Sequence, residues 1–528
     1  MGGGFTLKWI EGLRVFIDRT VAALTDPRHR ERAIIGMLTG YALLWTVYGL
    51  LAKAGQGVQT DPAEIVAWSR HLALGSIKHP PLAAWLVYGW FTIFPVAEWS
   101  FYLFSMVYTF AGLWLAWRLF GYYLDADKRV VALALLTLVP IYNFFALRFD
   151  VNIVLPPLWA ATTLCFIRSF ETRSAGWAAL AGAAAAVAML GKYWSLCLLI
   201  GLAVAVLLDP RRGIYFRSRA PWITLAFGAA LLAPHIAWLV HSDFSPLGYA
   251  FDERATHSFA ETLKATGKYL AGGAGYMAAP VLLVLAASRP SLAACADIVY
   301  PQSRERRFVL IAFLTPLLLP AVVALATETN VNAIWTMTGF ALLPVVLLSS
   351  PTIVIERRAT QVVAAIAIAV PVLMTIAAPA IAIAIHRTDR NENTMYAEML
   401  AQRMLLEWHK ASDRPLRIVG GDLDLAYATA FYLPDAPASL PFDEQYLAPW
   451  IDAARIAHEG IVTACRLGFN VRHHYGCALR YGDDDAQRII QGKPNVRRIE
   501  VTMTRSFFGA PDQTMPFLIY VVPPAAAN

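Results

Sequence analysis

The sequence predicts an α-helical polytopic membrane protein that ends in a soluble domain of mixed α/β structure. Hydrophobic residues make up 58% of the 528 residues and charged residues only 15%, compared with about 45–50% and about 25% in ordinary soluble domains. The charge is also unevenly distributed, because residues 387–528 carry 15 Lys/Arg and 17 Asp/Glu. This composition excludes a soluble globular enzyme and a disordered chain. It favours a membrane-embedded body followed by a soluble C-terminal domain.

Apolar runs define the expected membrane-embedded body. A helix needs about 17–25 apolar residues to cross a bilayer. Segment 80–96 is apolar but short, begins at Pro80-Pro81 and ends at Pro95, which favours an interfacial helix. The remaining apolar runs predict eleven spans, at residues 34–53, 100–118, 130–147, 152–168, 175–191, 193–209, 221–240, 269–287, 307–326, 333–350 and 360–385.

Basic residues set the expected topology, because Lys and Arg accumulate in cytoplasmic loops. With eleven spans, 21 Lys/Arg fall inside and 8 fall in the outer segments before the C-terminal domain. A crossing helix at 80–96 would instead force the basic loop DPRRGIYFRSR outside. We therefore expect a basic cytoplasmic N-terminus (1–33), a transmembrane domain (34–386) with a first outer loop at 54–99, and a periplasmic domain (387–528). The N-terminus lacks the pattern of a cleavable signal.

The C-terminal segment has the alternation expected of mixed α/β structure. RIVGGD, GIVTAC, RRIEVTMT and FLIYVV read as strands, and NTMYAEMLAQRMLLEWHKA has the apolar spacing of an amphipathic helix. The charged GDDD at 482–485 is typical of a solvated turn. Cys465 and Cys477 would lie in an oxidising periplasm, where either a disulfide or two free thiols fit the sequence. Cys spacing and neighbouring His residues indicate no metal site.

The first outer loop, QTDPAEIVAWSRHLALGSIKHPPLAAWL, concentrates ionisable residues beside the membrane. Asp61 precedes Pro62, so it either caps a short helix or serves as a catalytic carboxylate. Glu64 stands three residues on, as in a capping box. Ionisable side chains at membrane depth are costly and are functional candidates. The loop's ionisable residues are Asp61, Glu64, Arg70, His71, Lys78 and His79.

Further polar and aromatic residues fall at other expected outer ends of spans. Any one of them fits a snorkelling cation or an interfacial aromatic belt. Together they supply cations for a phosphate, aromatic rings for a sugar and a carboxylate for proton abstraction. The set is Arg148, Asp150, Lys192, Tyr193, His235 and Trp335. Glycine-rich nucleotide loops and hydrolase motifs are absent from the sequence, and nothing favours nucleic-acid binding.

Four stretches resemble a known family. TDPAEIVAWSRHLALGSIKHPPLAAWL, LRFDVNIVLPPLWA, GKYWS and APHIAWLVHSDFSPLGYA are similar to the glycosyltransferase family 39/83 group over about residues 34–340. These are membrane enzymes of the GT-C type, among them the protein O-mannosyltransferases and the aminoarabinose and galacturonic acid transferases of lipid A and lipopolysaccharide core. The resemblance implies a polyprenyl-phosphate sugar donor and inverting transfer on the outer face of the membrane, with a variable exported C-terminal domain.

The resemblance also implies roles for particular residues. The family's essential carboxylate after the first span matches Asp61. Many members carry a second acidic residue directly after it, whereas this chain has Pro62 there and Glu64 next. The Lys or His before the family's Pro-Pro matches His79, with Lys78 beside it, and is expected to meet the donor phosphate.

We therefore expect a glycosyltransferase of a bacterial inner membrane that modifies lipopolysaccharide, lipid A or another envelope glycan or lipid. Asp61 would be the base, with Glu64 and Asp150 as candidate second carboxylates. No cofactor is required, and a divalent metal is left open. A protein acceptor is the alternative within the family, and a multispan lipid or solute transporter is the alternative from another class. The expected phosphate ligands are Arg70, Lys78, His79, Arg148 and Lys192, and the expected sugar or acceptor contacts are Tyr193, His235 and Trp335.

Overall fold

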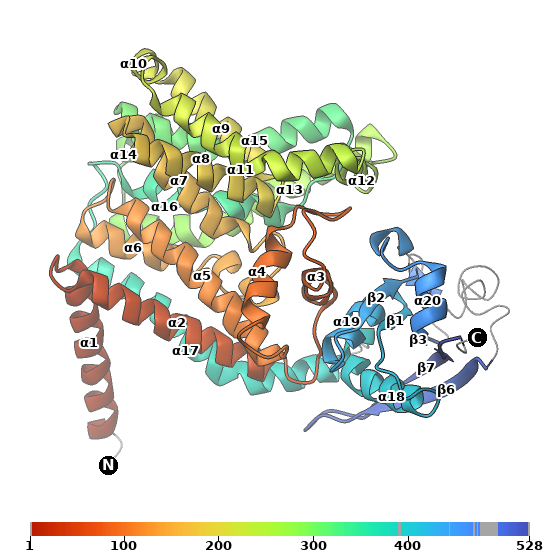
Figure 1. Ribbon diagram of the computed structural model, residues 1–528. Helices are drawn as coiled ribbons and strands as arrows, with labels where there is room; N and C mark the ends of the chain where they lie inside the picture. The colour runs from red at the N-terminus through yellow and green to blue at the C-terminus, as the bar shows by residue number, and fades with distance from the viewer. Residues whose placement is uncertain are drawn as a thin grey trace. The chain divides into compact units, whose positions relative to one another are not determined.

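The computed structural model describes residues 3–388, 392–442, 444–467, 470–471, 474–475 and 495–525, with side chains for residues 11–388, 392–442, 444–467 and 495–525. It divides into two compact units. Unit 1 comprises Met1–Thr46, Ile77–Leu82 and Leu103–Met374, and unit 2 comprises Val47–Ser76, Ala83–Tyr102 and Thr375–Asn528. The first outer loop therefore groups largely with the C-terminal residues. Figure 1 shows the order of helices and strands along the chain.

Helices account for most of the described chain. The α-helices are α1 (Gly3–Thr25), α2 (Arg30–Ala52), α3 (Thr60–Ser69), α4 (Leu82–Phe91), α5 (Glu98–Phe120), α6 (Ala126–Thr137), α7 (Leu155–Thr172), α8 (Ala175–Gly191), α9 (Ser195–Leu208), α10 (Arg212–Arg217), α11 (Ala220–His241), α12 (Ser245–Asp252), α13 (Phe259–Ser288), α14 (Leu292–Val299), α15 (Arg304–Thr327), α16 (Leu343–Leu348), α17 (Arg357–Arg387), α18 (Ala397–His409), α19 (Leu423–Tyr432) and α20 (Ala453–Glu459). The 3₁₀ helices are η1 (Pro140–Tyr142), η2 (Ala146–Arg148), η3 (Ala333–Gly339), η4 (Asn393–Tyr396) and η5 (Gln445–Leu447).

Six helices among the described residues are long and apolar enough to cross a membrane: α2, α5, α11, α13, α15 and α17. Each coincides with an expected span, and α7, α8 and α9 are helices at three more. Helix α4 has only 10 residues, or about 15 Å at the α-helical rise, which fits the expected interfacial helix at 80–96. The chain is thus a multi-pass membrane protein, and the count of eleven spans stays a prediction.

Two of the expected spans are not continuous helices. In segment 130–147, α6 ends at Thr137, and Pro140 begins the short 3₁₀ helix η1. In segment 333–350, η3 comes first and the short helix α16 follows, with Pro344 in its first turn. Proline lacks a backbone N–H and disfavours helical backbone in the residue before it. Val139 accordingly adopts an extended conformation (φ −77°, ψ 130°). The expectation of one continuous helix in each segment was wrong, whereas the crossing of the membrane by these segments stays a prediction.

Small residues allow close helix packing in unit 1. Helix α8 packs against both α7 and α11, and α9 packs against α15. A Cβ atom at Gly182 of α8 would lie 2.2 Å from the carbonyl oxygen of Thr224 in α11. The Thr224 hydroxyl donates a 3.0 Å hydrogen bond to the Ala178 carbonyl. Glycine contacts and interhelical hydrogen bonds of this kind are typical of helices packed within membranes.

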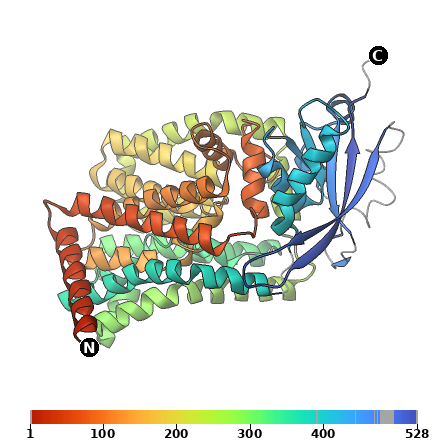
Figure 2. The ribbon, with the colours of Figure 1, turned by 90° about the horizontal axis from the view of Figure 1, so that it is seen from below.

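Unit 2 contains a five-stranded sheet of order β2-β1-β3-β7-β6, in which β1 pairs parallel with β2 and β3, and β7 pairs antiparallel with β3 and β6 (Figure 2). Four strands coincide with the sequence expectation, and α18 with the expected helix. Strand β2 and helices α19 and α20 were not anticipated. Helix α18 buries Trp408 in a core with Phe517 of β7. The strands are β1 (Ile418–Gly421), β2 (Ala438–Pro441), β3 (Ile461–Arg466), β4 (Asn470–Val471), β5 (His474–Tyr475), β6 (Arg497–Arg505) and β7 (Gln513–Val522).

Candidate active site

Asp61 lies in the first turn of α3, in unit 2, and its side chain is exposed. The N-cap of α3 is Gln59, with extended backbone (φ −71°, ψ 160°). Of the two alternatives left open for Asp61, the capping role is therefore excluded, because the N-cap lies two residues earlier. A carboxylate in the first turn still interacts favourably with the helix dipole. The exposed position leaves the Asp61 side chain suited to a role other than capping.

The backbone before α3 is held by the C-terminal residues of the same unit. Gly57 has φ +70°, and a Cβ atom there would lie 2.1 Å from the Thr394 carbonyl oxygen, so the close approach requires glycine. The next residue, Val58, donates its N–H to the Tyr432 hydroxyl at 2.9 Å. Helix α3 also packs against α19. The position of Asp61 thus depends on residues far away in the sequence.

Arg70 is bound to the backbone of unit 2. Its Nη1 donates to the Pro437 carbonyl at 2.7 Å, and its Nη2 donates to the Ala430 carbonyl at 3.0 Å. Ala430 lies near the C-terminal end of α19, where carbonyl groups lack helical partners. Arg70 thus joins the end of α3 to α19 and to the chain that enters β2. We therefore leave it out of the proposed phosphate site.

His71 and Glu64 are also packed within unit 2. The His71 ring stacks on Trp450, with ring centroids 4.4 Å apart. Burial lowers the pKa of His71, and the nearby Arg455 and Arg70 lower it further. Glu64 is only 7% exposed. The pKa of Tyr427 is raised first by burial and then by nearby carboxylates, with Glu64 the nearest contributor.

Asp150, the other candidate second carboxylate, lies in unit 1 and is 9% exposed. Its Oδ1 accepts the backbone N–H groups of Asn152 at 2.7 Å and Ile153 at 3.1 Å. Asp150 therefore stabilises the turn that leads into α7. Arg148, in η2, precedes the same turn. These contacts give Asp150 a structural role whether or not it also meets a substrate.

Two cations of unit 1 contact Trp335 and, together with Lys78, also lie close enough to His79 to affect its charge. We call Lys78, His79, Lys192, Arg254 and Trp335 the cation cluster. The Lys192 Nζ lies 4.7 Å from the Trp335 ring centroid, and the Arg254 Cζ lies 5.0 Å from it. Burial lowers the pKa of His79 well below its usual value, and Lys192, Lys78 and Arg254 lower it further. The cluster concentrates positive charge that favours an anionic ligand.

Backbone pairing explains why Arg254 reaches Trp335. The Arg254 carbonyl accepts the Asn330 N–H at 2.7 Å, and Ala255 forms an isolated antiparallel bridge with Thr329. This pairing holds the segment after α12 against the chain that begins η3, which carries Trp335. The sequence analysis did not select Arg254, although it is one of the eight cations of the outer segments. Because Lys and Arg are scarce in the outer segments, the presence of Arg254 there was a sequence signal for a functional cation.

The turn between α8 and α9 connects the cation cluster to an aromatic group. Lys192 donates a 2.6 Å hydrogen bond to Asn152 Oδ1. The Tyr193 hydroxyl lies 3.0 Å from His235 Nε2, and the His235 ring stacks on Trp238 with centroids 5.6 Å apart. These contacts therefore bring four of the expected site residues into one region of unit 1: Lys192, Tyr193, His235 and Trp335.

Cys465 of β3 is disulfide-bonded, whereas Cys165, Cys197 and Cys295 are free thiols. Cys477 and the GDDD turn lie outside the described residues, so the Cys465–Cys477 pairing stays a prediction. Within the described part of the chain, no three His, Cys, Asp or Glu side chains are arranged to hold a metal ion.

Three comparisons with known proteins agree with the sequence expectation. The profile of the family described as dolichyl-phosphate-mannose-protein mannosyltransferase matches residues 78–238. The lipopolysaccharide core galacturonosyltransferase RgtB of Rhizobium johnstonii is 28% identical over 225 residues, which cover 41% of this chain and 44% of that protein. The match thus spans less than half of the relative's length.

Solved structures share the fold. ArnT from Cupriavidus metallidurans bound to undecaprenyl phosphate has a TM-score of 0.61 and 12% identity, covering 94% of this chain and 99% of that chain. The apo state of the same protein has a TM-score of 0.60 and 12% identity, covering 92% and 97%. At this identity the likeness concerns the fold, which is the expected GT-C type. The family profile, the related sequence and the shared fold all support a GT-C glycosyltransferase.

Proposed function

We propose that the chain is an inverting glycosyltransferase that moves a sugar from a polyprenyl phosphate to lipopolysaccharide, lipid A or another envelope glycan or lipid. The reaction would take place on the periplasmic face of a bacterial inner membrane. The observation that carries the proposal is the cation cluster, in which the charges of Lys78, Lys192 and Arg254 all lower the pKa of His79. Three cations and a tryptophan in an otherwise apolar chain suit a lipid-linked phosphate that carries a sugar.

The similar proteins support this choice of substrates. RgtB is named as a lipopolysaccharide core galacturonosyltransferase, and ArnT has been solved with undecaprenyl phosphate. Proteins similar to this chain thus include one that binds a polyprenyl phosphate and one named for transfer to lipopolysaccharide core, and both support the proposed donor and acceptor. The identity of the sugar is not part of the proposal.

The proposed reaction is a single displacement. The Asp61 carboxylate accepts the proton of the acceptor hydroxyl, whose oxygen forms a bond to the anomeric carbon. The bond between that carbon and the phosphate oxygen breaks, and polyprenyl phosphate leaves with the electron pair. Base catalysis of this kind typically contributes about 10²–10⁴-fold. Asp61 is proposed for this role because it matches the family's essential carboxylate and has an exposed side chain.

The cation cluster would bind the donor phosphate and stabilise the charge that it gains as the bond breaks. His79 is held neutral at pH 7 by burial and the three neighbouring cations. A bound phosphate brings negative charge that opposes this effect, so the imidazole can take up a proton and donate a hydrogen bond to the phosphate. Lys192 and Arg254 both lie over the Trp335 ring, and Trp335 would supply the aromatic contact for the sugar next to the phosphate.

Asp61→Asn tests the proposal, because the amide keeps the shape of the side chain and removes its basicity. Purified protein in detergent is given a polyprenyl-phosphate sugar and lipid A or lipopolysaccharide, and transfer is followed by mass spectrometry. The variant is expected to lose at least about 10²-fold in rate while its expression stays normal. Asp413→Asn, an exposed carboxylate of the same unit, is the matched control and should keep full activity. Normal transfer by Asp61→Asn would refute the assignment.

Two other functions give different results in the same system. A protein acceptor, as in the family description matched by residues 78–238, predicts a mass increase on protein and none on lipid A or lipopolysaccharide. A transporter predicts movement of the lipid-linked sugar across vesicle membranes with no release of the sugar from its phosphate. The mass change of lipids and glycans in cells that lack the protein distinguishes the acceptors.

A further inference from the structure

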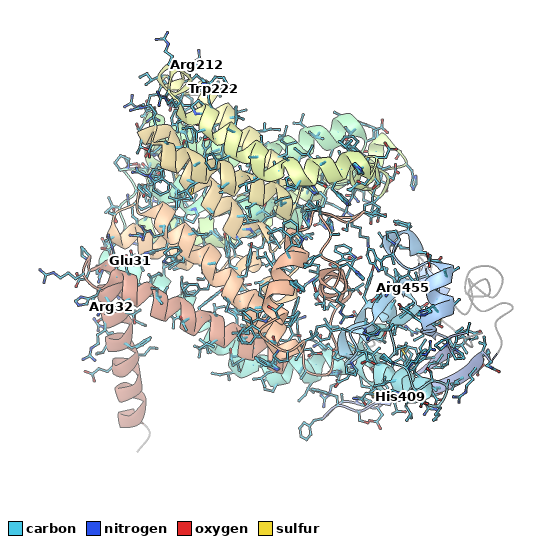
Figure 3. All side chains as sticks on the ribbon, viewed as in Figure 1. Glu31, Arg32, Arg212, Trp222, His409 and Arg455 are labelled. Carbon is cyan, nitrogen blue, oxygen red and sulfur yellow. The ribbon has the colours of Figure 1, made fainter. Side chains whose placement is uncertain are left out.

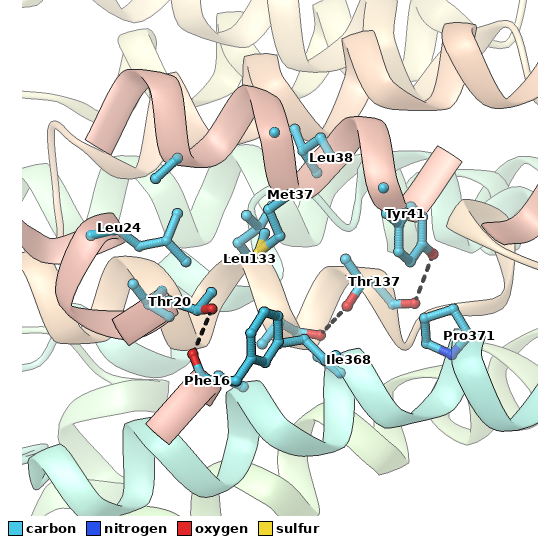
Figure 4. Close-up of a pocket in the computed structure, with 18 of the residues that line it drawn as sticks. Phe16, Thr20, Leu24, Met37, Leu38, Tyr41, Leu133, Thr137, Ile368 and Pro371 are labelled. Carbon is cyan, nitrogen blue, oxygen red and sulfur yellow. Dashed lines mark hydrogen bonds between the residues drawn. The ribbon is translucent and has the colours of Figure 1, made fainter. Parts of the chain in front are cut away.

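Unit 1 contains an apolar cavity of about 560 Å³ that is separate from the cation cluster. Four helices line it: α1, α2, α6 and α17 (Figure 4). Its volume falls within the range of about 300–1,000 Å³ that is typical of small-molecule sites. The proposed reaction assigns no role to this cavity or to α1.

The cavity wall offers few polar groups. The Thr20 hydroxyl donates to the Phe16 carbonyl at 2.8 Å, and the Thr137 hydroxyl donates to the Ala134 carbonyl at 2.7 Å. The Tyr41 hydroxyl donates to the Tyr142 carbonyl at 2.8 Å. These internal hydrogen bonds satisfy the hydroxyl groups, so an occupant would meet an essentially apolar surface along the wall.

The two charged lining residues are both arginines, Arg19 of α1 and Arg32 of α2. Both are exposed, and Arg32 projects at the beginning of α2 (Figure 3). Among the residues that the structure describes, neither guanidinium has an ion-pair or hydrogen-bond partner. An occupant must therefore combine an apolar body with an anionic end.

The dimensions of the cavity favour an acyl chain. Its lining residues on α2 run from Arg32 to Leu44, which is about 18 Å along the helix. Half of the hydrocarbon core of a bilayer is about 15 Å thick. The cavity thus extends from the end of a membrane-crossing helix, where the arginines lie, across about one leaflet. A polyprenyl chain of many isoprene units would exceed this length.

We propose that this cavity binds an anionic glycerophospholipid, with an acyl chain between α2, α6 and α17 and its phosphate at Arg19 and Arg32. Gly36 and Gly40 help to create the space, because a Cβ atom at either position would meet nothing within 4 Å. The inference concerns a lipid of the surrounding bilayer and is independent of the donor and acceptor. In the expected topology the site faces the cytoplasmic leaflet, whose anionic lipids attract basic segments.

Native mass spectrometry of the full chain, released from nanodiscs with equal amounts of phosphatidylglycerol and phosphatidylcholine, tests the proposal. The protein should retain phosphatidylglycerol preferentially. The Arg19→Gln, Arg32→Gln double variant should lose about tenfold or more of this preference. Arg14→Gln, Arg28→Gln is the matched control, because it removes the same charge from exposed arginines outside the cavity, and should behave as the unaltered protein.

A second variant tests the cavity itself. Gly36→Leu, Gly40→Leu fills the space without weakening the helix, because leucine is a better helix former than glycine. It should also lose the retained lipid while both arginines remain. Equal retention of the two phospholipids, or unchanged retention in either lining variant, would overturn the proposal. Displacement of phosphatidylglycerol by added undecaprenyl phosphate at comparable concentration would overturn the choice of occupant. Because the readout is lipid binding, an inactive enzyme would not affect the result.

Discussion

Replacing Arg254 by glutamine removes one cation from around Trp335 and keeps a long polar side chain. The Arg254 Cζ lies 5.0 Å from the Trp335 centroid, and the Lys192 Nζ lies 4.7 Å from the same ring. Lys192 would therefore keep its contact with the ring in the variant. A cation–π contact contributes about 0.5–2 kcal/mol. The effect of Arg254→Gln on folding should thus be small.

The effect of Arg254→Gln on the affinity for the donor phosphate should be larger than its effect on folding. A charge-assisted hydrogen bond contributes about 1.5–3 kcal/mol, which corresponds to about a 10- to 100-fold weaker affinity for polyprenyl phosphate. The leaving phosphate carries more negative charge in the transition state than in the bound donor. The loss in kcat/KM for Arg254→Gln should therefore equal or exceed the loss in affinity.

The assay measures binding of undecaprenyl phosphate to purified protein in detergent, together with steady-state transfer. Lys264→Gln is the matched control, because Lys264 is an exposed cation of α13 in the same unit. It should change affinity less than about twofold, as is usual for an exposed charge outside a binding site. Unchanged affinity and kcat/KM in Arg254→Gln, with a normal melting temperature, would refute the placing of the phosphate at the cation cluster.

Three further expectations follow from contacts in the two units. Arg70→Met should lower the melting temperature, because two buried carbonyls lose charge-assisted hydrogen bonds worth roughly 3–6 kcal/mol together; an unchanged melting curve would contradict this. Since the pKa of His79 is lowered in the free protein and a bound phosphate opposes that shift, the bound state holds more protons. The proton uptake that accompanies binding of polyprenyl phosphate, measured by calorimetric titration, should therefore be smaller in His79→Gln than in the unaltered protein. Cys465→Ser should lower the melting temperature in the absence of reductant, by the loss of a cross-link worth about 2–4 kcal/mol; equal curves for both proteins would contradict a structural disulfide.

Much of the fold could be predicted from local patterns. Six long apolar helices coincide with expected spans because a helix that satisfies its own backbone needs only length and apolarity to cross a bilayer. Strands such as β3 and β7 were recognisable because buried strands are continuous apolar runs. The short β2 and the apolar helix α19 were missed, since their sequences carry little periodicity of their own and depend on pairing with β1 and packing on α3.

The candidate site was only partly predictable, because sequence position does not reveal the partner of a charged residue. Arg70 and Arg254 are both outer cations in the expected topology. Arg70 binds two carbonyls of unit 2, whereas Arg254 contacts Trp335 in unit 1. The difference arises from non-local contacts, which are the docking of α3 on α19 and the pairing of Ala255 with Thr329. The sequence could therefore identify the cations of the outer segments, but it could not separate those that bind protein backbone from those that join the cation cluster.

The two expected spans that are interrupted helices meet in the same part of unit 1. The 3₁₀ helices η1 and η3, which replace parts of the expected spans 130–147 and 333–350, pack against each other, and η3 also packs against α7 and α13. Non-helical backbone at membrane depth is tolerated only where protein buries it or where it lines a water-filled cavity. Helix η3 carries Trp335, the centre of the cation cluster, so one of the two interruptions lies at the proposed phosphate site.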